Sequence, residues 1–301
     1  MRKYLLSETG TFYKANLHCH TTVSDGHTTP EETKQAYMEM GYSIIAFTDH
    51  RKFVSHNDLT DDKFLALNGI EADTYEKNVT DWSRAKVCHL CVIALDENMR
   101  SVPGCKRLEY SGESVTAYIK ECRENGCFVT YNHPFWSLES YPEYMSYKGA
   151  NALEIVNYGC VVEGYLDRND KAYDDMLRGG ERLFAIAADD NHGRSHFFGG
   201  YTMIKADSLT YKDISKALTG GNFYASESGP DILELYVEDG KLYIKTDSAR
   251  EIFLTTDKRF RKRVLGNEAV FDLQECIYFR LTAIDDKGNA SYTNAYFTDS
   301  L

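Results

Sequence analysis

Two histidines one residue apart, His18 and His20, are the first residues of this sequence whose types and spacing suggest chemistry. A carboxylate, Asp25, follows them in a Ser-Asp-Gly turn. Residues i and i+2 of a β-strand lie on the same face, so both imidazoles can contact one metal ion. Taken alone, the histidine pair is also typical of an exposed strand, and Asp25 is typical of a turn. The rest of the sequence therefore decides between a metal site and unrelated polar residues.

Further residues that can bind metals stand where later apolar runs end or begin. They are His50 in AFTDH, Glu71 in NGIEAD, His89 at the start of CHLCVIAL, and His133 before the proline of TYNHPF. A polar side chain at the end of a buried strand is costly unless it is paired or ligated. Together, these positions favour a metal site more strongly than any of them does alone.

The segment AADDNHG supplies the last two candidates, Asp190 and His192. Strand alternation places Asp190 on the same face as His192, so we expect Asp190 rather than Asp189 at the site. We also expect Asp49 to orient a ligand histidine by a hydrogen bond from outside the metal shell.

Alternating strands and helices must bring these residues together. Apolar runs predict strands at residues 13–20, 43–50, 64–73, 86–96, 128–134, 152–159 and 183–192, and helices at 29–42, 111–127 and 167–180. This alternation predicts an α/β fold with a mostly parallel sheet or a (β/α) barrel. Active sites of such folds form at the C-terminal ends of the strands. The predicted strands end in or near His20, His50, Glu71, His133 and His192, so we expect these side chains to converge.

The pattern changes after residue 228. Alternating apolar residues, with Asp-Gly and Lys-Gly turns between them, predict a series of strands without intervening helices. We therefore expect two domains: a metal-dependent α/β domain at 1–228 and a small all-β, sandwich-like domain at 229–301.

Composition limits the classes of function. The chain has 301 residues and a formal net charge of −12, so it lacks the basic field on which non-specific nucleic-acid binding depends. No apolar run reaches the roughly 18 residues of a membrane span, and MRKYLLSETG has no apolar stretch long enough for a secretory signal. The eight cysteines show no disulfide framework, and Cys88 and Cys91 have no second such pair to complete a zinc site. We expect a cytoplasmic protein with no membrane partner. Nucleic acid is disfavoured as a binding partner, and the oligomeric state stays open.

The order of these motifs resembles the PHP (polymerase and histidinol phosphatase) family. HCH, SDG, TDH, GIE, a histidine before an apolar strand, NHP and DDNH follow one another in the family's order, and the resemblance covers about residues 12–228. It implies a distorted (β/α)7 barrel with two or three divalent metal ions at the C-terminal ends of the strands. The β-rich tail lies outside this core resemblance and is similar to sandwich tails of some stand-alone phosphoesterases of this kind.

The resemblance also implies a ligand set. Matching motifs would place one ion on His18, His20, Glu71 and Asp190, a second on Glu71, His89 and His133, and a third on Asp25, His50 and His192. Mixed imidazole and carboxylate ligands suit Mn, Zn or Fe better than Mg alone. Glu71 as a bridging ligand, and Asp190 and His192 as groups that assist proton transfer, are the expected catalytic residues.

The implied reaction is hydrolysis of a phosphoester in a small phosphorylated metabolite or nucleotide, by attack of a metal-activated hydroxide on phosphorus. Arg194 and Arg51 are the expected phosphate contacts, because guanidinium matches phosphate geometry. His196 and His56 are candidates for the entrance, whereas His27 is expected to begin a helix. The aromatic segment 131–147 either stacks on a base or sugar or packs on the barrel rim. Two alternatives stay open: an exonuclease acting on nucleic-acid ends, and a non-catalytic binding module that contains metals.

Overall fold

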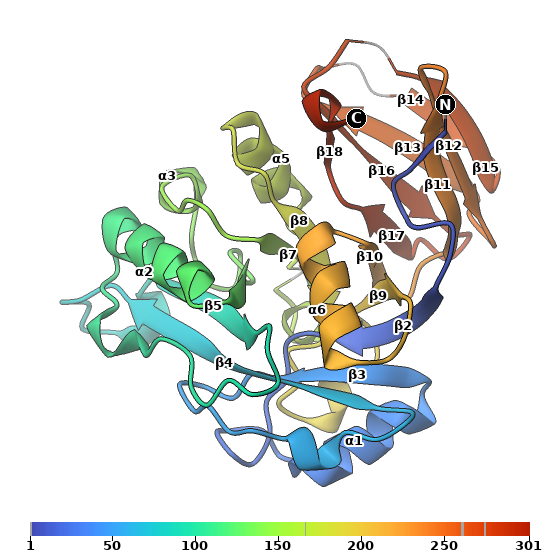
Figure 1. Cartoon of the computed structure of the whole chain (residues 1–301). Coiled ribbons are helices and arrows are strands. Elements are labelled where there is room, and N and C mark those ends of the chain that lie inside the picture. The colour runs from blue at the N-terminus through green and yellow to red at the C-terminus, as the bar shows by residue number, and fades with distance from the viewer. Residues whose placement is uncertain (1, 166, 260–261, 274) are drawn as a thin grey trace.

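The computed structural model describes residues 2–165, 167–259, 262–273 and 275–301 (Figure 1). Seven strands, each next to its neighbour in the sequence, form the part of the sheet that carries the predicted site. They are β2 (Thr11–Asn16), β3 (Tyr42–Phe47), β4 (Leu65–Tyr75), β5 (Val87–Ala94), β6 (Cys127–Tyr131), β7 (Ala152–Asn157) and β8 (Phe184–Ala188). The predicted α/β class is confirmed.

One strand of this set runs in the opposite direction to the other six. Strands β2–β4 are parallel to one another and β6–β8 likewise, but β5 is antiparallel to both β4 and β6. The connection between β4 and β5 holds only the short 3₁₀ helix η2 (Trp82–Arg84), and so it lacks the crossover helix that parallel strands require. As a consequence, the start of β5 lies at the same edge of the sheet as the ends of its neighbours.

The curved sheet brings its first and last strands together beyond their ends. Cys19 and Asn191 form a parallel bridge, and the amide of Asp190 donates to the carbonyl of His18 over 3.0 Å. Within the described residues, β2 and β8 share no strand ladder, and β2 instead pairs with β9 (Tyr201–Ala206), which pairs with β10 (Phe223–Glu227). The closed (β/α)7 barrel therefore stays a prediction.

Helices pack against the strands of the sheet. They are α1 (Pro30–Glu39), α2 (Gly112–Glu124), α3 (Tyr141–Tyr144), α4 (Tyr158–Val162), α5 (Asp170–Arg178) and α6 (Tyr211–Gly220), with further 3₁₀ turns η1 (Asn57–Leu59), η3 (Cys105–Arg107), η4 (Arg194–His196) and η5 (Thr298–Ser300). Helix α1 begins with a capping box, because the Thr29 hydroxyl accepts from the Glu32 amide while the Glu32 carboxylate accepts from the Thr29 amide. Figure 1 shows α6 in front of the sheet, and its Ile214 and Leu218 pack with alternate apolar residues of the strands.

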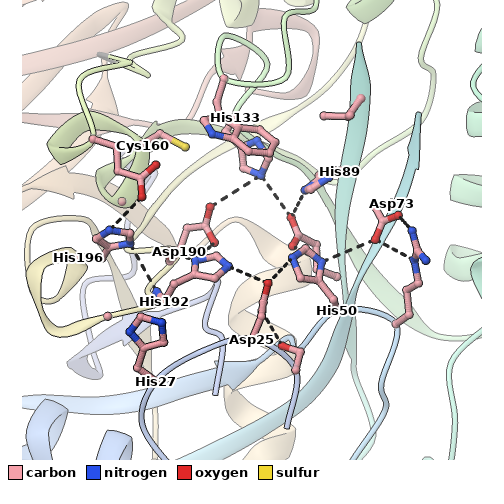
Figure 2. A pocket seen from close by; sticks show the side chains of 18 of the residues that line it. Asp25, His27, His50, Asp73, His89, His133, Cys160, Asp190, His192 and His196 are labelled. Atoms are coloured by element: carbon pink, nitrogen blue, oxygen red, sulfur yellow. Dashed lines mark hydrogen bonds and ion pairs between the residues drawn. The ribbon is translucent and has the colours of Figure 1, made fainter. Parts of the chain in front are cut away.

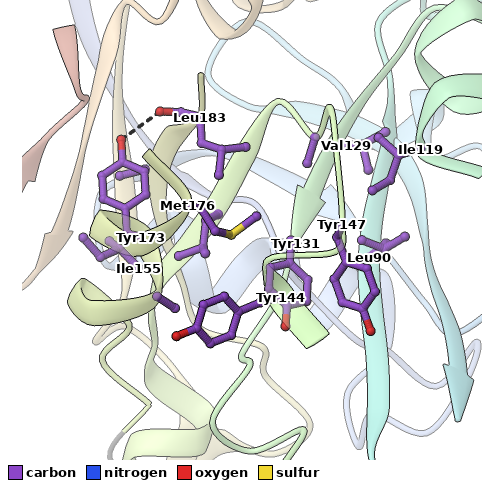
Figure 3. Packing of buried hydrophobic residues seen from close by; sticks show 14 of the residues in the cluster. Leu90, Ile119, Val129, Tyr131, Tyr144, Tyr147, Ile155, Tyr173, Met176 and Leu183 are labelled. Atoms are coloured by element: carbon purple, nitrogen blue, oxygen red, sulfur yellow. Dashed lines mark hydrogen bonds between the residues drawn. The ribbon is translucent and has the colours of Figure 1, made fainter. Parts of the chain in front are cut away.

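A second apolar cluster lies between the sheet and helices α2 and α5. It includes Ile119 of α2, Val129 of β6, and Tyr173 and Met176 of α5 (Figure 3). The Tyr173 hydroxyl donates to the Leu183 carbonyl over 2.8 Å, so this buried ring also has its polar atom satisfied. Packing on this face fixes β6, β7 and β8, whose far ends carry His133, Asp190 and His192.

The C-terminal strands form two packed sheets that are joined to the rest of the molecule. They are β11 (Ile232–Glu238), β12 (Lys241–Thr246), β13 (Glu251–Thr256), β14 (Lys262–Leu265), β15 (Glu268–Asp272), β16 (Tyr278–Ile284), β17 (Ala290–Thr293) and β18 (Tyr296–Phe297). Strand β17 pairs with β10, so the sheet continues across the predicted boundary at 228/229. Strand β1 (Lys3–Tyr4) pairs with β11, and Figure 1 shows the N-terminus beside the C-terminal strands. The division into two domains stays a prediction.

Within the part of the chain that the structure describes, no helix is both long enough and apolar enough to span a membrane.

Candidate metal centre

All nine predicted metal ligands lie at one edge of the sheet. Figure 2 labels Asp25, His50, His89, His133, Asp190 and His192 among them. His18 and His20 follow β2, His50 follows β3, and Asp190 and His192 follow β8. Because β5 is reversed, His89 near its start joins them, and its cross-strand neighbour on β4 is Asp73. The convergence expected from the strand order is therefore present, and it includes one residue from a strand that runs in the opposite direction.

Four side chains form the innermost group of donor atoms. The Nε2 atoms of His18 and His20 lie 3.1 Å apart, and each is 3.1 Å from Oδ1 of Asp190. Each also lies 3.2 Å from one carboxylate oxygen of Glu71. His18, His20 and Glu71 are buried almost completely, and Asp190 is 7 % exposed. The two oxygens of Glu71 thus face different histidines, as a bridging carboxylate would.

Glu71 also contacts the second predicted group. Its Oε1 lies 2.9 Å from Nδ1 of His89 and 3.3 Å from Nε2 of His133, and its Oε2 lies 3.0 Å from Nδ1 of His50. The expectation that Glu71 stands at a strand end is wrong. Strand β4 continues four residues further, to Tyr75, because its pairing with β5 extends it.

The third group surrounds Asp25 in the loop after β2. Its Oδ2 lies 3.6 Å from Nε2 of His50 and 3.6 Å from Nε2 of His192, and Figure 2 shows Asp25 between these two rings. Its Oδ1 lies 3.6 Å from Nδ1 of His20, so His20 borders this group as well as the innermost one. A Cβ atom at Gly26 would lie 2.5 Å from the His20 backbone, so only glycine lets the Asp25 turn pack this closely.

The donor set fits divalent metal ions. Three of the buried donor atoms, Nδ1 of His20, Nδ1 of His50 and Oδ1 of Asp190, form no hydrogen bond of good geometry among the described residues, although charged groups lie 3.0–3.6 Å from them. Such atoms are costly unless something else satisfies them. The donor separations of 3.1–3.2 Å in the innermost group match the edges of a coordination polyhedron, which are about 3.0–3.4 Å for metal–ligand bonds of about 2.1 Å. Mixed imidazole and carboxylate donors are what transition metals prefer.

Charges in the centre are mutually stabilising without metal. Burial lowers the pKa of His20, but hydrogen bonds and charges from Asp190 and Glu71 outweigh it and raise the pKa to about 9. The pKa of His133 is raised to about 9 in the same way, chiefly by Glu71 against the effect of burial. A hydrogen bond from His192 holds the pKa of Asp25 far below its usual range. A divalent ion that binds here would have to displace these protons.

A model of the PHP domain family matches residues 16–178, more than half of the chain. The chain belongs to the PHP family. The predicted resemblance is confirmed, over a shorter range than the expected 12–228. Membership and the gathered donor set support the predicted class of enzyme, a metal-dependent phosphoric ester hydrolase.

Solved structures of similar proteins share 14 % identity with this chain. One is a two-domain protein containing a predicted PHP-like metal-dependent phosphoesterase from Bacteroides vulgatus, with 98 % of each chain covered and a TM-score of 0.49. Another, from Bifidobacterium adolescentis, is assigned as a metal-dependent phosphoesterase; the match covers 68 % of this chain and 94 % of that one, with a TM-score of 0.41. A third is a lesion-specific endonuclease from Pyrococcus furiosus, with coverages of 70 % and 56 % and a TM-score of 0.43. A search of curated protein sequences found no match.

Sequence reasoning missed a buried glutamate that supports the PHP centre. Glu154 of β7 is fully buried; its Oε1 accepts from Nδ1 of His18 over 3.1 Å, and its Oε2 accepts from the His133 amide over 3.1 Å. The same Oε2 accepts from Nδ2 of Asn157 over 2.8 Å, and this amide also donates to Oδ2 of Asp190 over 3.0 Å. The available signal was the glutamate inside the apolar run ALEIVN, because a charged side chain is rarely buried without a partner.

Two aspartates next to the predicted ligands shape loops instead. The expectation that Asp49 orients a ligand histidine is not met: it accepts from the amides and hydroxyls of Thr21 and Ser24 and so fixes the turn before Asp25. Asp189 is buried and accepts from the amides of residues 198–200, which holds the loop after β8. The structure therefore places Asp190, not Asp189, in the centre.

A cavity of about 1090 Å³ opens onto the centre. Arg194 lines it, is exposed, and forms no ion pair among the described residues, whereas Arg51 makes a two-point contact with Asp73. His196 lines the cavity as expected. The expectation that His56 lies at the entrance is wrong, because its ring packs 4.6 Å from that of Phe47 and it does not line the cavity. The expectation that His27 begins a helix is also wrong: helix α1 begins at Pro30, and His27 lines the cavity.

Proposed function

We propose that the chain hydrolyses the phosphoester of a small phosphorylated compound bound in this cavity. The observation that carries the proposal is the cluster of nine side chains able to bind metals, seven of which line the cavity, with His18 and His20 buried beside them. Three buried atoms of this cluster form no hydrogen bond of good geometry within the described chain. The residues that would hold divalent ions are His18, His20, Asp25, His50, Glu71, His89, His133, Asp190 and His192. When bound, such ions polarise the phosphoryl group and lower the pKa of water. Their identity among Mn, Zn and Fe, and their number, two or three, belong to the proposal.

Arg194 is the favoured phosphate contact. It stands two residues after His192 in η4, is exposed to the cavity and has no competing ion pair among described residues. A guanidinium that is not engaged elsewhere can donate two parallel hydrogen bonds to a phosphate. Arg51 was the other candidate, but the carboxylate of Asp73 already takes two of its donors. We therefore assign Arg51 the role of holding Asp73 at the cavity wall.

The catalytic roles expected for Glu71, Asp190 and His192 are part of the proposal. Glu71 faces histidines with both oxygens, which suits a bridging position. Asp190 and His192 both line the cavity and lie 3.7 Å apart between Oδ1 and Nδ1. Either group could move a proton to or from a substrate oxygen that lies within about 3 Å of it.

The test is phosphate release from a panel of small phosphoesters by protein loaded with Mn, Zn or Fe, with and without chelator. We expect chelator-sensitive release, and we expect Glu71→Gln to lose both bound metal and release. His56→Gln is the matched control, because it alters a buried histidine outside the cavity and should keep metal content. Digestion of single-stranded oligonucleotides without release from small esters would favour an exonuclease. Full metal content without turnover of either would favour a non-catalytic module.

A further inference from the structure

One wall of the cavity is aromatic. Tyr75 at the end of β4, Trp82 at the start of η2, and Trp136 in the loop after β6 line the same cavity as His89 and His133. The ring of Trp136 lies 5.1 Å from that of His133 and 5.5 Å from that of His89, so this wall begins directly at the metal centre. All three aromatic residues come from the β4–β6 part of the sheet.

Two of these rings are exposed without an aromatic neighbour. Trp82 is 63 % exposed and Tyr75 is 49 % exposed, and among the described residues neither ring stacks on another. Large apolar surface left in water beside a reactive centre is unfavourable unless a ligand covers it, and such patches commonly mark binding sites. Trp136, by contrast, packs against histidines and Tyr165, so it is a fixed surface on which a ligand can lie.

Figure 2 shows His27 and His196 across the centre from His89, and the wall on their side has different chemistry. Arg194, His196 and His27, from the β8 side and the loop before α1, line the cavity there. Of the cations that line the cavity, Arg51 is paired with Asp73 and Lys52 donates to the Val23 carbonyl, whereas Arg194 forms no ion pair among the described residues. The phosphoryl group and the rest of the substrate therefore have distinct places on the two sides of the metal centre.

We propose that Tyr75, Trp82 and Trp136 form a subsite for a flat, uncharged aromatic ring carried by the leaving group of the substrate. The inference rests on the proposed function and names the substrate class of that site. Stacking on indole and phenol rings requires planarity and a π-face but no particular pattern of hydrogen bonds. The ring can belong to a simple aryl group or to a nucleobase, and these two sources share the same chemistry.

Non-hydrolysable probes test the subsite without turnover. Benzylphosphonate and cyclohexylmethylphosphonate have the same phosphonate and a similar size, and differ in ring planarity. Isothermal titration of metal-loaded protein should show the benzyl compound binding about tenfold more tightly. Trp82→Ala should remove this preference and leave methylphosphonate binding unchanged, while Trp82→Phe should restore most of it. Tyr141→Ala is the matched control, because Tyr141 is 56 % exposed on α3 outside the cavity.

The outcomes separate the inference from the function on which it rests. Equal affinity for the two ring compounds, with methylphosphonate still bound, would overturn the subsite alone. Failure of every phosphonate to bind metal-loaded protein would overturn the proposed function and the subsite with it. A preference that survives Trp82→Ala would also contradict the assigned residues. Where the subsite holds, comparing kcat/KM for adenosine 5′-monophosphate and ribose 5-phosphate with that for benzyl phosphate distinguishes a nucleobase from a simple aryl group.

Discussion

Glu154→Gln is the substitution that most directly tests how the protein prepares the metal centre. The carboxylate of Glu154 accepts three hydrogen bonds, from Nδ1 of His18, from the His133 amide and from Nδ2 of Asn157. A carboxylate can only accept, so Nδ1 of His18 carries the proton and Nε2 is left free to face the other donor atoms. A glutamine has one acceptor oxygen and one amide group, and cannot satisfy all three donors.

Either orientation of the glutamine has a defined consequence. If its oxygen keeps the bonds to His133 and Asn157, its amide faces Nδ1 of His18 and favours the tautomer in which Nε2 carries the proton and cannot bind metal. If its oxygen keeps His18, its amide meets two buried donors, which costs about 1–3 kcal/mol. Loss of such an outer hydrogen bond typically weakens metal binding by about 10- to 100-fold, or about 1.4–2.8 kcal/mol.

The assay is competition for Zn or Mn against a chromophoric chelator, with circular dichroism as the check on folding. Glu139→Gln provides a control of the same chemical change. Glu139 is also a buried glutamate that accepts three hydrogen bonds, from the hydroxyls of Tyr110, Tyr131 and Tyr147, but it lies outside the metal cavity. We expect its metal affinity to be unchanged. A folded Glu154→Gln protein with wild-type metal affinity would refute the tautomer argument.

Three further predictions concern pH and stability. Because the pKa of His20 and of His133 is about 9 without metal, protons compete with metal below that pH, and chelator competition should show apparent affinity falling steadily as pH is lowered from 9 to 6. Burial raises the pKa of Glu139 to about 7, so the stability that its protonated carboxyl contributes is present below about pH 4.5 and is lost as the pH rises to 7. Urea unfolding from pH 4.5 to 7 should therefore show the free energy of unfolding of the wild type falling by up to about 3 kcal/mol relative to Glu139→Gln. Arg280 of β16 is buried and donates to Asp174 of α5 over 2.8 Å, so Arg280→Met should lower the free energy of unfolding by about 3 kcal/mol. Lys245→Met, which removes the exposed ion pair of Lys245 with Glu268, should change it by less than about 1 kcal/mol. An unchanged unfolding midpoint in Arg280→Met would show that the C-terminal strands are not held by this ion pair.

The candidate metal ligands could be predicted from the sequence because each stands next to an apolar run that indicates a strand. An apolar run that ends in a histidine or an acidic residue needs only local information, and strand direction then decides where that residue lies. His89 lies beside the other candidates although it stands near the start of its strand, because that strand is antiparallel to its neighbours. The short polar stretch between β4 and β5, too short for a crossover helix, was the signal that β5 is reversed.

Other features depend on contacts between residues distant in the sequence. The pairing of β1 with β11 spans most of the chain, and nothing in Lys3–Tyr4 specifies that partner. Arg51 looked free for phosphate because Asp73 lies 22 residues away, and the contact exists only because β4 continues past Glu71. Glu154 appeared to be an ordinary strand residue, since its importance comes from His18, which lies 136 residues earlier.

The extended pair of β4 and β5 links the metal centre to the aromatic wall. In this antiparallel ladder Glu71 is opposite Cys91, and Asp73 is opposite His89, so Glu71 and His89 are diagonal neighbours on one face with their side chains 2.9 Å apart. The same two strands continue outward to Tyr75 and to the connection that carries Trp82. Under the proposed subsite, changes in residues 76–86 would alter which leaving group is accepted, while the ladder beneath them would keep Glu71 and His89 in place. Specificity and metal binding would then be separable within a single hairpin.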